Sequence, residues 1–77
     1  MNYNIRVYLF PDTSDYIRNN DYLLDEIEVN TNTYIYYNRL EFNSFFEIEG
    51  LFENVHRARI MLQEIEKEIY KQCNLQS

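Results

Sequence analysis

The sequence predicts an α+β domain in which a three-stranded antiparallel sheet is covered on one face by three helices. Two observations carry this prediction: an alternating run near the start of the chain, and a helical stripe of apolar residues near its end. Two short helical patterns and two β-type runs lie between them. Because a sheet with one apolar face needs a second layer, helices packed on that face are the natural arrangement. With 77 residues, we expect one domain spanning residues 1–77.

The first strand is predicted over residues 3–10, where side chains of two kinds alternate. One face would carry Tyr3, Ile5, Val7 and Leu9, and the other Asn4, Arg6, Tyr8 and Phe10. Pro11 is expected to end the strand, because proline has no N–H to donate to a strand ladder.

Two short helices are predicted next. Asp12, Thr13 and Ser14 are residue types that favour the N-cap of a helix. Apolar residues then recur at helical spacing, and the polar stretch 18–21 interrupts them. Asn and Asp compete for backbone hydrogen bonds, so we expect a bend there rather than one long helix.

Two further strands follow a turn predicted at residues 30–32. The run 33–37 is rich in Tyr and Ile, which favours a strand. A polar loop is expected over residues 38–44, and a second alternating run over residues 45–49.

The last helix is the clearest pattern in the chain. Its apolar residues are spaced by 3, 4, 3 and 4 positions: Val55, Ala58, Leu62, Ile65 and Ile69. This spacing places them in one stripe along an α-helix. Asn54 is the predicted N-cap.

Charge and composition restrict the function. The chain has seven Lys and Arg residues against thirteen Asp and Glu, a net charge of −6. Lys and Arg supply most non-specific affinity for nucleic acid, so this balance is unfavourable for that function. The single cysteine, Cys73, excludes an internal disulfide; we expect a reduced thiol and a cytoplasmic protein. No apolar run reaches the roughly 20 residues that span a bilayer, so no membrane partner is expected.

Enzymatic chemistry finds little support in these residues. One glycine cannot form a phosphate-binding P-loop or a dinucleotide fingerprint. His56 has no second His or Cys at metal-ligand spacing and no evident nucleophile to activate. We therefore expect no catalytic residues, no metal and no cofactor.

Several segments resemble the type I KH family, whose element order is βααββα. Residues 50–59 (GLFENVHRAR) resemble the KH segment in which a strand ends in Gly and the last helix begins with Glu-Asn-Val, a basic residue and Ala. Residues 31–35 (TNTYI) resemble the turn and second strand of KH domains of the Bicaudal-C and germline RNA-regulator type. The likeness covers nearly the whole chain. An α+β domain of unrelated ancestry is the alternative, and a different strand order would indicate it.

The resemblance places Arg18, Asn19, Asn20 and Asp21 at the Gly-x-x-Gly loop, where family members hold a nucleic-acid backbone. Both glycines are missing. Glycine allows close approach of backbone to phosphate, so its loss implies a degenerate loop. The alternative is a purely structural loop, with Asn20 or Asp21 capping the second helix, and Arg18 is expected to pair with Asp15 or Asp21.

The same resemblance places Ile17, Leu24, Ile35 and Tyr37 near the apolar groove that accepts bases in a KH domain. Core packing is the favoured alternative for these residues, and it explains Tyr34 and Tyr36, or Ile35 and Tyr37, equally well. The leading hypothesis is a protein-interaction or scaffold module in an RNA-regulatory protein, bound to a protein partner or to a neighbouring KH domain. Weak single-stranded RNA binding through Arg18 and the groove is the alternative.

Exposed aromatic side chains are candidates for a partner surface, because a core this small cannot bury them all. They are Tyr8, Phe10, Tyr16, Tyr22, Phe45 and Phe52. The outer face of the sheet is one location for such a surface. An open edge strand is another, for a homodimer or for a peptide that adds as a further strand.

Overall fold

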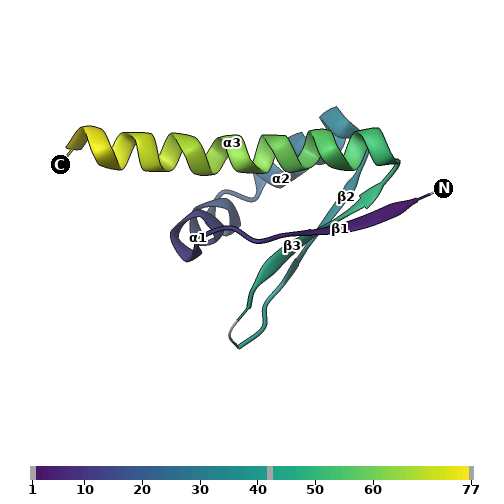
Figure 1. The fold of residues 1–77 in the computed structure, drawn as a ribbon, viewed down its shortest axis with the longest axis horizontal. Coiled ribbons are helices and arrows are strands. Elements are labelled where there is room, and N and C mark those ends of the chain that lie inside the picture. The colour runs from purple at the N-terminus through teal and green to yellow at the C-terminus, as the bar shows by residue number, and fades with distance from the viewer. Residues whose placement is uncertain (1, 42, 77) are drawn as a thin grey trace.

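The fold has the predicted order of elements (Figure 1). The computed structural model describes the backbone of residues 2–41 and 43–76 and the side chains of residues 2–41 and 43–72, so the side chain of Cys73 lies outside the described residues. The elements are β1 (Tyr3–Val7), α1 (Pro11–Asn19), α2 (Tyr22–Thr31), β2 (Tyr34–Asn38), β3 (Phe45–Gly50) and α3 (Phe52–Gln76). The predicted break between two short helices is confirmed, since α1 ends and α2 begins on either side of residues 20–21.

The sheet is antiparallel and has the strand order β1-β3-β2. Ile48 of the central strand lies opposite Ile5 on one side and Ile35 on the other. Both outer strands are therefore edges, and each has one row of backbone groups that faces away from β3.

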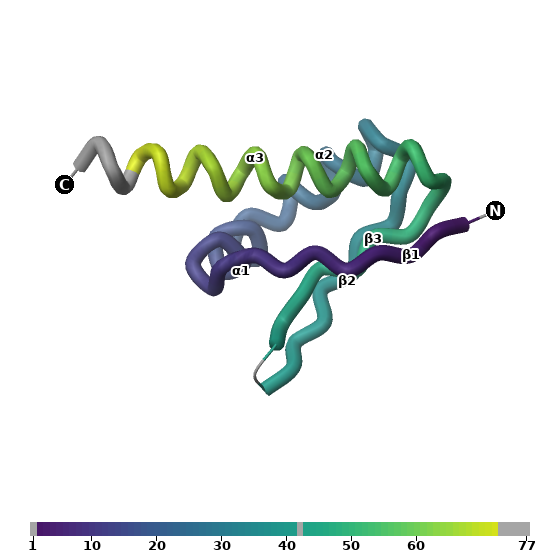
Figure 2. The backbone as a smooth tube through the Cα atoms, in the orientation of Figure 1, coloured from purple at the N-terminus to yellow at the C-terminus, as the bar shows by residue number. Residues whose placement is uncertain are grey.

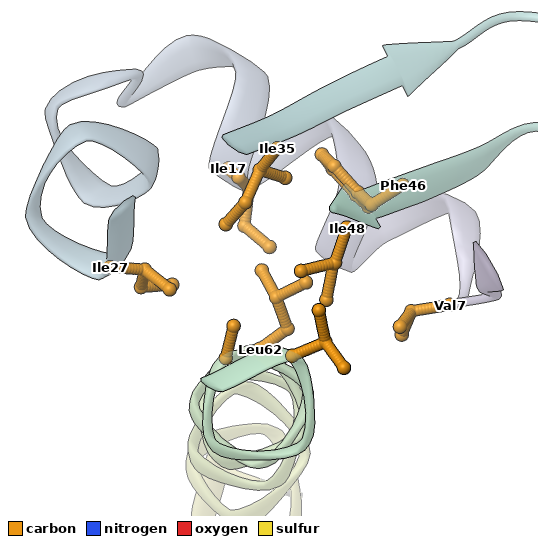
Figure 3. Close-up of a cluster of buried hydrophobic side chains, with 9 residues drawn as sticks. Val7, Ile17, Ile27, Ile35, Phe46, Ile48 and Leu62 are labelled. Carbon is orange, nitrogen blue, oxygen red and sulfur yellow. The ribbon is translucent and has the colours of Figure 1, made fainter. Parts of the chain in front are cut away.

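The core lies between one face of this sheet and the helices (Figure 3). All six elements contribute to its buried members, which are Val7, Ile17, Ile27, Ile35, Phe46, Ile48, Val55, Ala58 and Leu62. Burying one large apolar side chain contributes about 1.5–3 kcal/mol. Val55, Ala58 and Leu62 confirm the predicted stripe on the last helix, and its later members, Ile65 and Ile69, are half-buried.

The start of the chain corrects two predictions. β1 ends at Val7 rather than Phe10, because its ladder with β3 stops at the pair Val7–Phe46. The N–H of Phe10 instead donates to Glu66 Oε2 on α3, at 2.8 Å. Pro11 begins α1, where a missing N–H is not needed, so Asp12, Thr13 and Ser14 lie inside the helix and do not cap it.

The turn before β2 is shorter than predicted. α2 extends to Thr31, and the chain reverses at Asn32, whose φ of 53° is left-handed. The Thr31 hydroxyl donates to the carbonyl of Ile27 at 2.6 Å and lies 2.8 Å from the Thr33 hydroxyl. These bonds satisfy the buried hydroxyl groups of both threonines where α2 ends.

The last helix begins two residues before the predicted cap. α3 starts at Phe52, and the N–H of Val55 donates to the carbonyl of Leu51 at 2.9 Å. Asn54 is therefore inside the first turn. The ring of Phe52 packs edge-on against Tyr3 at 5.2 Å, which joins this turn to β1.

α3 continues beyond the sheet and passes over α1 (Figures 1 and 2). The ring of Phe10 packs edge-on against Tyr70 at 5.3 Å, so the connection between β1 and α1 rests on this part of α3. Within residues 2–41 and 43–76, no helix is both long and apolar enough to cross a membrane.

Candidate functional site

Arg18 and Asn19, predicted to lie in a loop, form the end of α1, and only Asn20 and Asp21 connect α1 to α2. Asn20 has φ −128° and ψ 62°, and Asp21 has φ −61° and ψ −19°. Among the described residues, Asn32 alone has a positive φ outside glycine. The loop therefore closes without the conformational freedom of glycine.

Hydrogen bonds within the loop use groups that could otherwise face a ligand. The N–H groups of Leu23 and Leu24, at the start of α2, donate to the carbonyls of Asn20 and Asp21 at 2.9 and 3.0 Å. The Asn20 side chain donates back to the carbonyl of Tyr16 at 2.8 Å and thus serves the end of α1. Asp21 occupies the N-cap position of α2, as one of the two predicted caps, but its side chain makes no capping hydrogen bond.

Arg18 lies over an aromatic ring. Its guanidinium carbon is 4.6 Å from the centre of the Tyr37 ring on β2, in place of the expected pairing with Asp15 or Asp21. A cation at this distance from an aromatic face contributes about 0.5–1 kcal/mol at an exposed site. Both residues, with Arg39, line a cavity of about 480 Å³ between α1 and the residues that follow β2.

The four predicted groove residues divide into two kinds. Ile17 and Ile35 are 0% and 8% exposed and belong to the core, so neither offers much surface to a ligand. Leu24 and Tyr37 are half-buried at its edge, and the Tyr37 ring lies 5.0 Å from Phe46. The two alternatives for β2 are thus resolved: Ile35 and Tyr37 face the core, and Tyr34 and Tyr36 are exposed.

Glu28 is a site residue that the sequence did not reveal. Its Oε2 accepts a hydrogen bond from the backbone N–H of Ile35 at 2.8 Å. This N–H belongs to the outer edge of β2, so the carboxylate occupies a donor that an added strand would need. Glu28 lies four residues after Leu24, on the same face of α2; that spacing was the available signal.

The outer face of the sheet holds a small aromatic cluster. The Arg6 guanidinium lies 4.6 Å from the centre of the Phe45 ring, and Tyr8 packs against the same ring at 5.5 Å. Phe45 is consequently only 5% exposed, which corrects its place among the candidates for a partner surface. The other five candidates are each about half exposed.

His56 contacts an aromatic ring and no metal cluster. Its ring packs edge-on against Phe52 at 4.5 Å, and the side chain is half-buried. In the part of the chain whose side chains are described, no group of three His, Cys, Asp or Glu residues is placed to hold a metal ion.

Comparison with known proteins finds similarity in structure but not in sequence. No family model matches the sequence, and no curated protein matches it. The N-terminal KH domain of human BICC1 is similar in structure, with a TM-score of 0.74 and 16% identity over 86% of this chain and 97% of that chain. The first type I KH domain of human Vigilin has a TM-score of 0.73 and 23% identity over 92% of this chain and 78% of that chain.

These similarities define the class of fold. A βααββα chain with the antiparallel sheet order β1-β3-β2 superposes on two KH domains over most of its length. The protein has the fold of a type I KH domain. The structural likeness to the BICC1 domain agrees with the resemblance to Bicaudal-C-type domains that the sequence suggested.

Proposed function

We propose that this chain is a divergent KH domain that serves as a protein-interaction or scaffold module in a cytoplasmic RNA-regulatory protein. Its partner would be another protein or a neighbouring KH domain. The family resemblance implies that Arg18, Asn19, Asn20 and Asp21 occupy the position of the Gly-x-x-Gly loop that clamps nucleotides in KH domains. Three features argue against tight RNA binding through this loop. They are the loop itself, the carboxylate at the free edge of β2 and the net negative charge of the chain.

The loop offers side chains where a phosphate would need backbone. Asp21 adds a carboxylate at the start of α2, and the N–H groups of Leu23 and Leu24 are already bonded to loop carbonyls. Two like charges about 4 Å apart in water repel by about 1 kcal/mol, before screening by salt. A nucleic-acid backbone is therefore disfavoured at this position.

The carboxylate of Glu28 is the observation that carries the proposal. It lies on the α2 side of the free edge of β2, within 2.8 Å of the Ile35 nitrogen. Together with Asp21 it places negative charge at both ends of α2, beside half-buried Leu24. A polyanion entering between α2 and β2 would meet both carboxylates and would compete with Glu28 for the Ile35 N–H.

Titration of the ¹⁵N-labelled protein with short random RNA pools, in about 150 mM salt, tests this proposal. We expect no shift of the amides of residues 18–24. The variant Asp21→Gly/Glu28→Gln removes both carboxylates, each worth about 1 kcal/mol against a phosphate 4 Å away in water, and should gain salt-dependent affinity. Sub-micromolar binding by the unmodified protein would overturn the proposal.

Weak binding of single-stranded RNA is the second candidate, and one observation favours it. Arg18, Tyr37 and Arg39 line the same cavity of about 480 Å³, which provides two cations beside an aromatic ring; Asp15 and Glu41 also line it. Stacking of one base on an aromatic side chain is worth about 1–3 kcal/mol. If this candidate holds, Arg18→Ala or Leu24→Asp abolishes a measurable RNA titration.

A further inference from the structure

A second groove lies on the opposite side of α1 from Arg18. It has a volume of about 460 Å³ and runs between α1, the start of α2 and the C-terminal half of α3. Tyr16, Leu23, Ile65 and Ile69 form its apolar floor, and Glu64 and Glu68 flank it on α3. Tyr16 and Arg18 are two residues apart on α1, about 200° around the helix, so this groove is separate from the candidate site.

The floor of the groove continues the apolar stripe of α3 past the core. Val55, Ala58 and Leu62 are fully buried, but Ile65 and Ile69 are only half-buried because the sheet does not extend beneath them. Figure 1 shows this part of α3 projecting beyond the strands. Tyr16, at 46% exposure, adds an aromatic side chain to the same surface. Four neighbouring apolar side chains are thus left without a covering layer.

The lining of the groove carries two carboxylates, Glu64 and Glu68, and no basic residue. Arg18 is the only basic residue between Pro11 and Thr31, and it faces Tyr37 instead. On α3, Lys67 and Lys71 follow Glu64 by three and seven positions, on the outer side of that carboxylate, and neither lysine lines the groove.

We propose that this groove docks an amphipathic, basic helix of a partner protein. The proposal rests on the interaction-module function proposed above and assigns that function a surface and a class of partner. The groove extends along α3 from Glu64 to Gln72, about 12 Å at 1.5 Å per residue. That length matches two turns of a helix whose apolar residues recur at i, i+3 or i+4, and i+7.

Charge selects the partner. Lys or Arg residues beside the apolar face of the incoming helix complement Glu64 and Glu68, which favours association and sets orientation. A second copy of this chain carries a net charge of −6 and presents the same acidic residues beside its own apolar stripe. Two such grooves would repel each other, so self-association is disfavoured.

A pair of synthetic peptides tests the proposal on the full chain. Both are amphipathic helices of about 18 residues, five turns long, with Leu at the same positions; one has Lys at its polar positions and the other Glu. We expect the Leu/Lys peptide to shift the amides of Tyr16, Leu23, Ile65 and Ile69, and the Leu/Glu peptide to shift none. Reversing the flank with Glu64→Lys/Glu68→Lys should reverse this preference.

Matched variants separate the groove from general attraction to an acidic protein. Ile69→Asp puts a charge in the apolar floor and should weaken binding of the Leu/Lys peptide at least about tenfold, as expected for a central contact. Ile60→Asp makes the same change at a 50% exposed position on α3 outside the groove and should leave binding unchanged. The amide spectrum of each variant verifies that it is folded.

Three results would overturn the groove assignment: shifts spread over the acidic surface or centred on the sheet, equal binding by Ile69→Asp and the unmodified chain, or a concentration-dependent dimer that buries the groove. The RNA titration remains a separate test. Tight RNA binding at residues 18–24 overturns the proposed function, whereas a negative peptide result with no RNA binding overturns only the groove.

Discussion

Glu28 joins α2 to the free edge of β2 by accepting the backbone N–H of Ile35 at 2.8 Å. A charged group thus holds a strand edge that would otherwise be open to an added strand or to a ligand. Among the edges expected to recruit a peptide or a second copy, this part of β2 is already occupied. The same bond fixes the distance between α2 and β2 beside half-buried Leu24.

Removing the Glu28 carboxylate should weaken the fold and free this edge. We expect Glu28→Ala to lower the free energy of unfolding by about 1–2 kcal/mol, because a hydrogen bond to a charged group is lost and the Ile35 N–H stays partly buried. Urea denaturation measures the loss, and hydrogen exchange of the Ile35 amide should become faster. Glu28→Gln, which keeps an acceptor oxygen, should lose less.

Glu26→Ala is the matched control, because Glu26 is an exposed carboxylate on the same helix. It should change stability by no more than about 0.5 kcal/mol. Equal losses for Glu26→Ala and Glu28→Ala would show that the bond to Ile35 contributes nothing specific.

The contact between Arg18 and Tyr37 should appear as a coupling between two substitutions. A double-mutant cycle with Arg18→Gln and Tyr37→Leu should give a coupling of about 0.5–1 kcal/mol, the usual size of an exposed cation–π contact. Thermal or urea denaturation of the four proteins measures it. Additive effects would mean that the 4.6 Å contact has no energetic weight.

Glycine should have opposite effects at Asn32 and at Asp21. Asn32 has a left-handed φ of 53°, so Asn32→Gly should stabilise the chain by about 0.5 kcal/mol. Asp21 has φ −61°, so Asp21→Gly should cost about 0.5–1 kcal/mol through the greater freedom of the unfolded chain. A gain in stability for Asp21→Gly would contradict the strain-free loop.

Gly50 should tolerate a methyl group poorly. A Cβ at this position would lie 3.1 Å from Thr33 Cγ2 and 3.5 Å from the carbonyl oxygen of Asn32. We expect Gly50→Ala to destabilise the fold by about 1 kcal/mol through overpacking. Thr33→Ser removes the contacting methyl group, so the loss from Gly50→Ala should shrink in that background; an unchanged loss would locate the strain elsewhere.

Most of the fold could be predicted from the sequence, but the ends of its elements could not. Alternating residues identified the strand β1, and the apolar stripe from Val55 to Leu62 identified the helix α3. Both patterns are visible in the sequence because burying one face of a strand or helix makes apolar residues recur at a regular spacing. The first helix was predicted to begin after Pro11, but it begins at Pro11. Proline can end a strand and can also occupy the first position of a helix, and the local sequence does not decide between the two. The length of β1 depends on where its partner β3 begins, which the run 3–10 does not contain.

The sequence alone determined the order of the elements, the break between two short helices and the absence of glycine from the loop at residues 18–21. Each of these follows from residues that are neighbours along the chain. Only the tertiary structure decided which distant groups meet: Arg18 with the Tyr37 ring, Glu28 with the backbone N–H of Ile35, and Glu66 with the backbone N–H of Phe10. Such pairs depend on how helices sit against the sheet, and side-chain packing between distant segments sets that geometry.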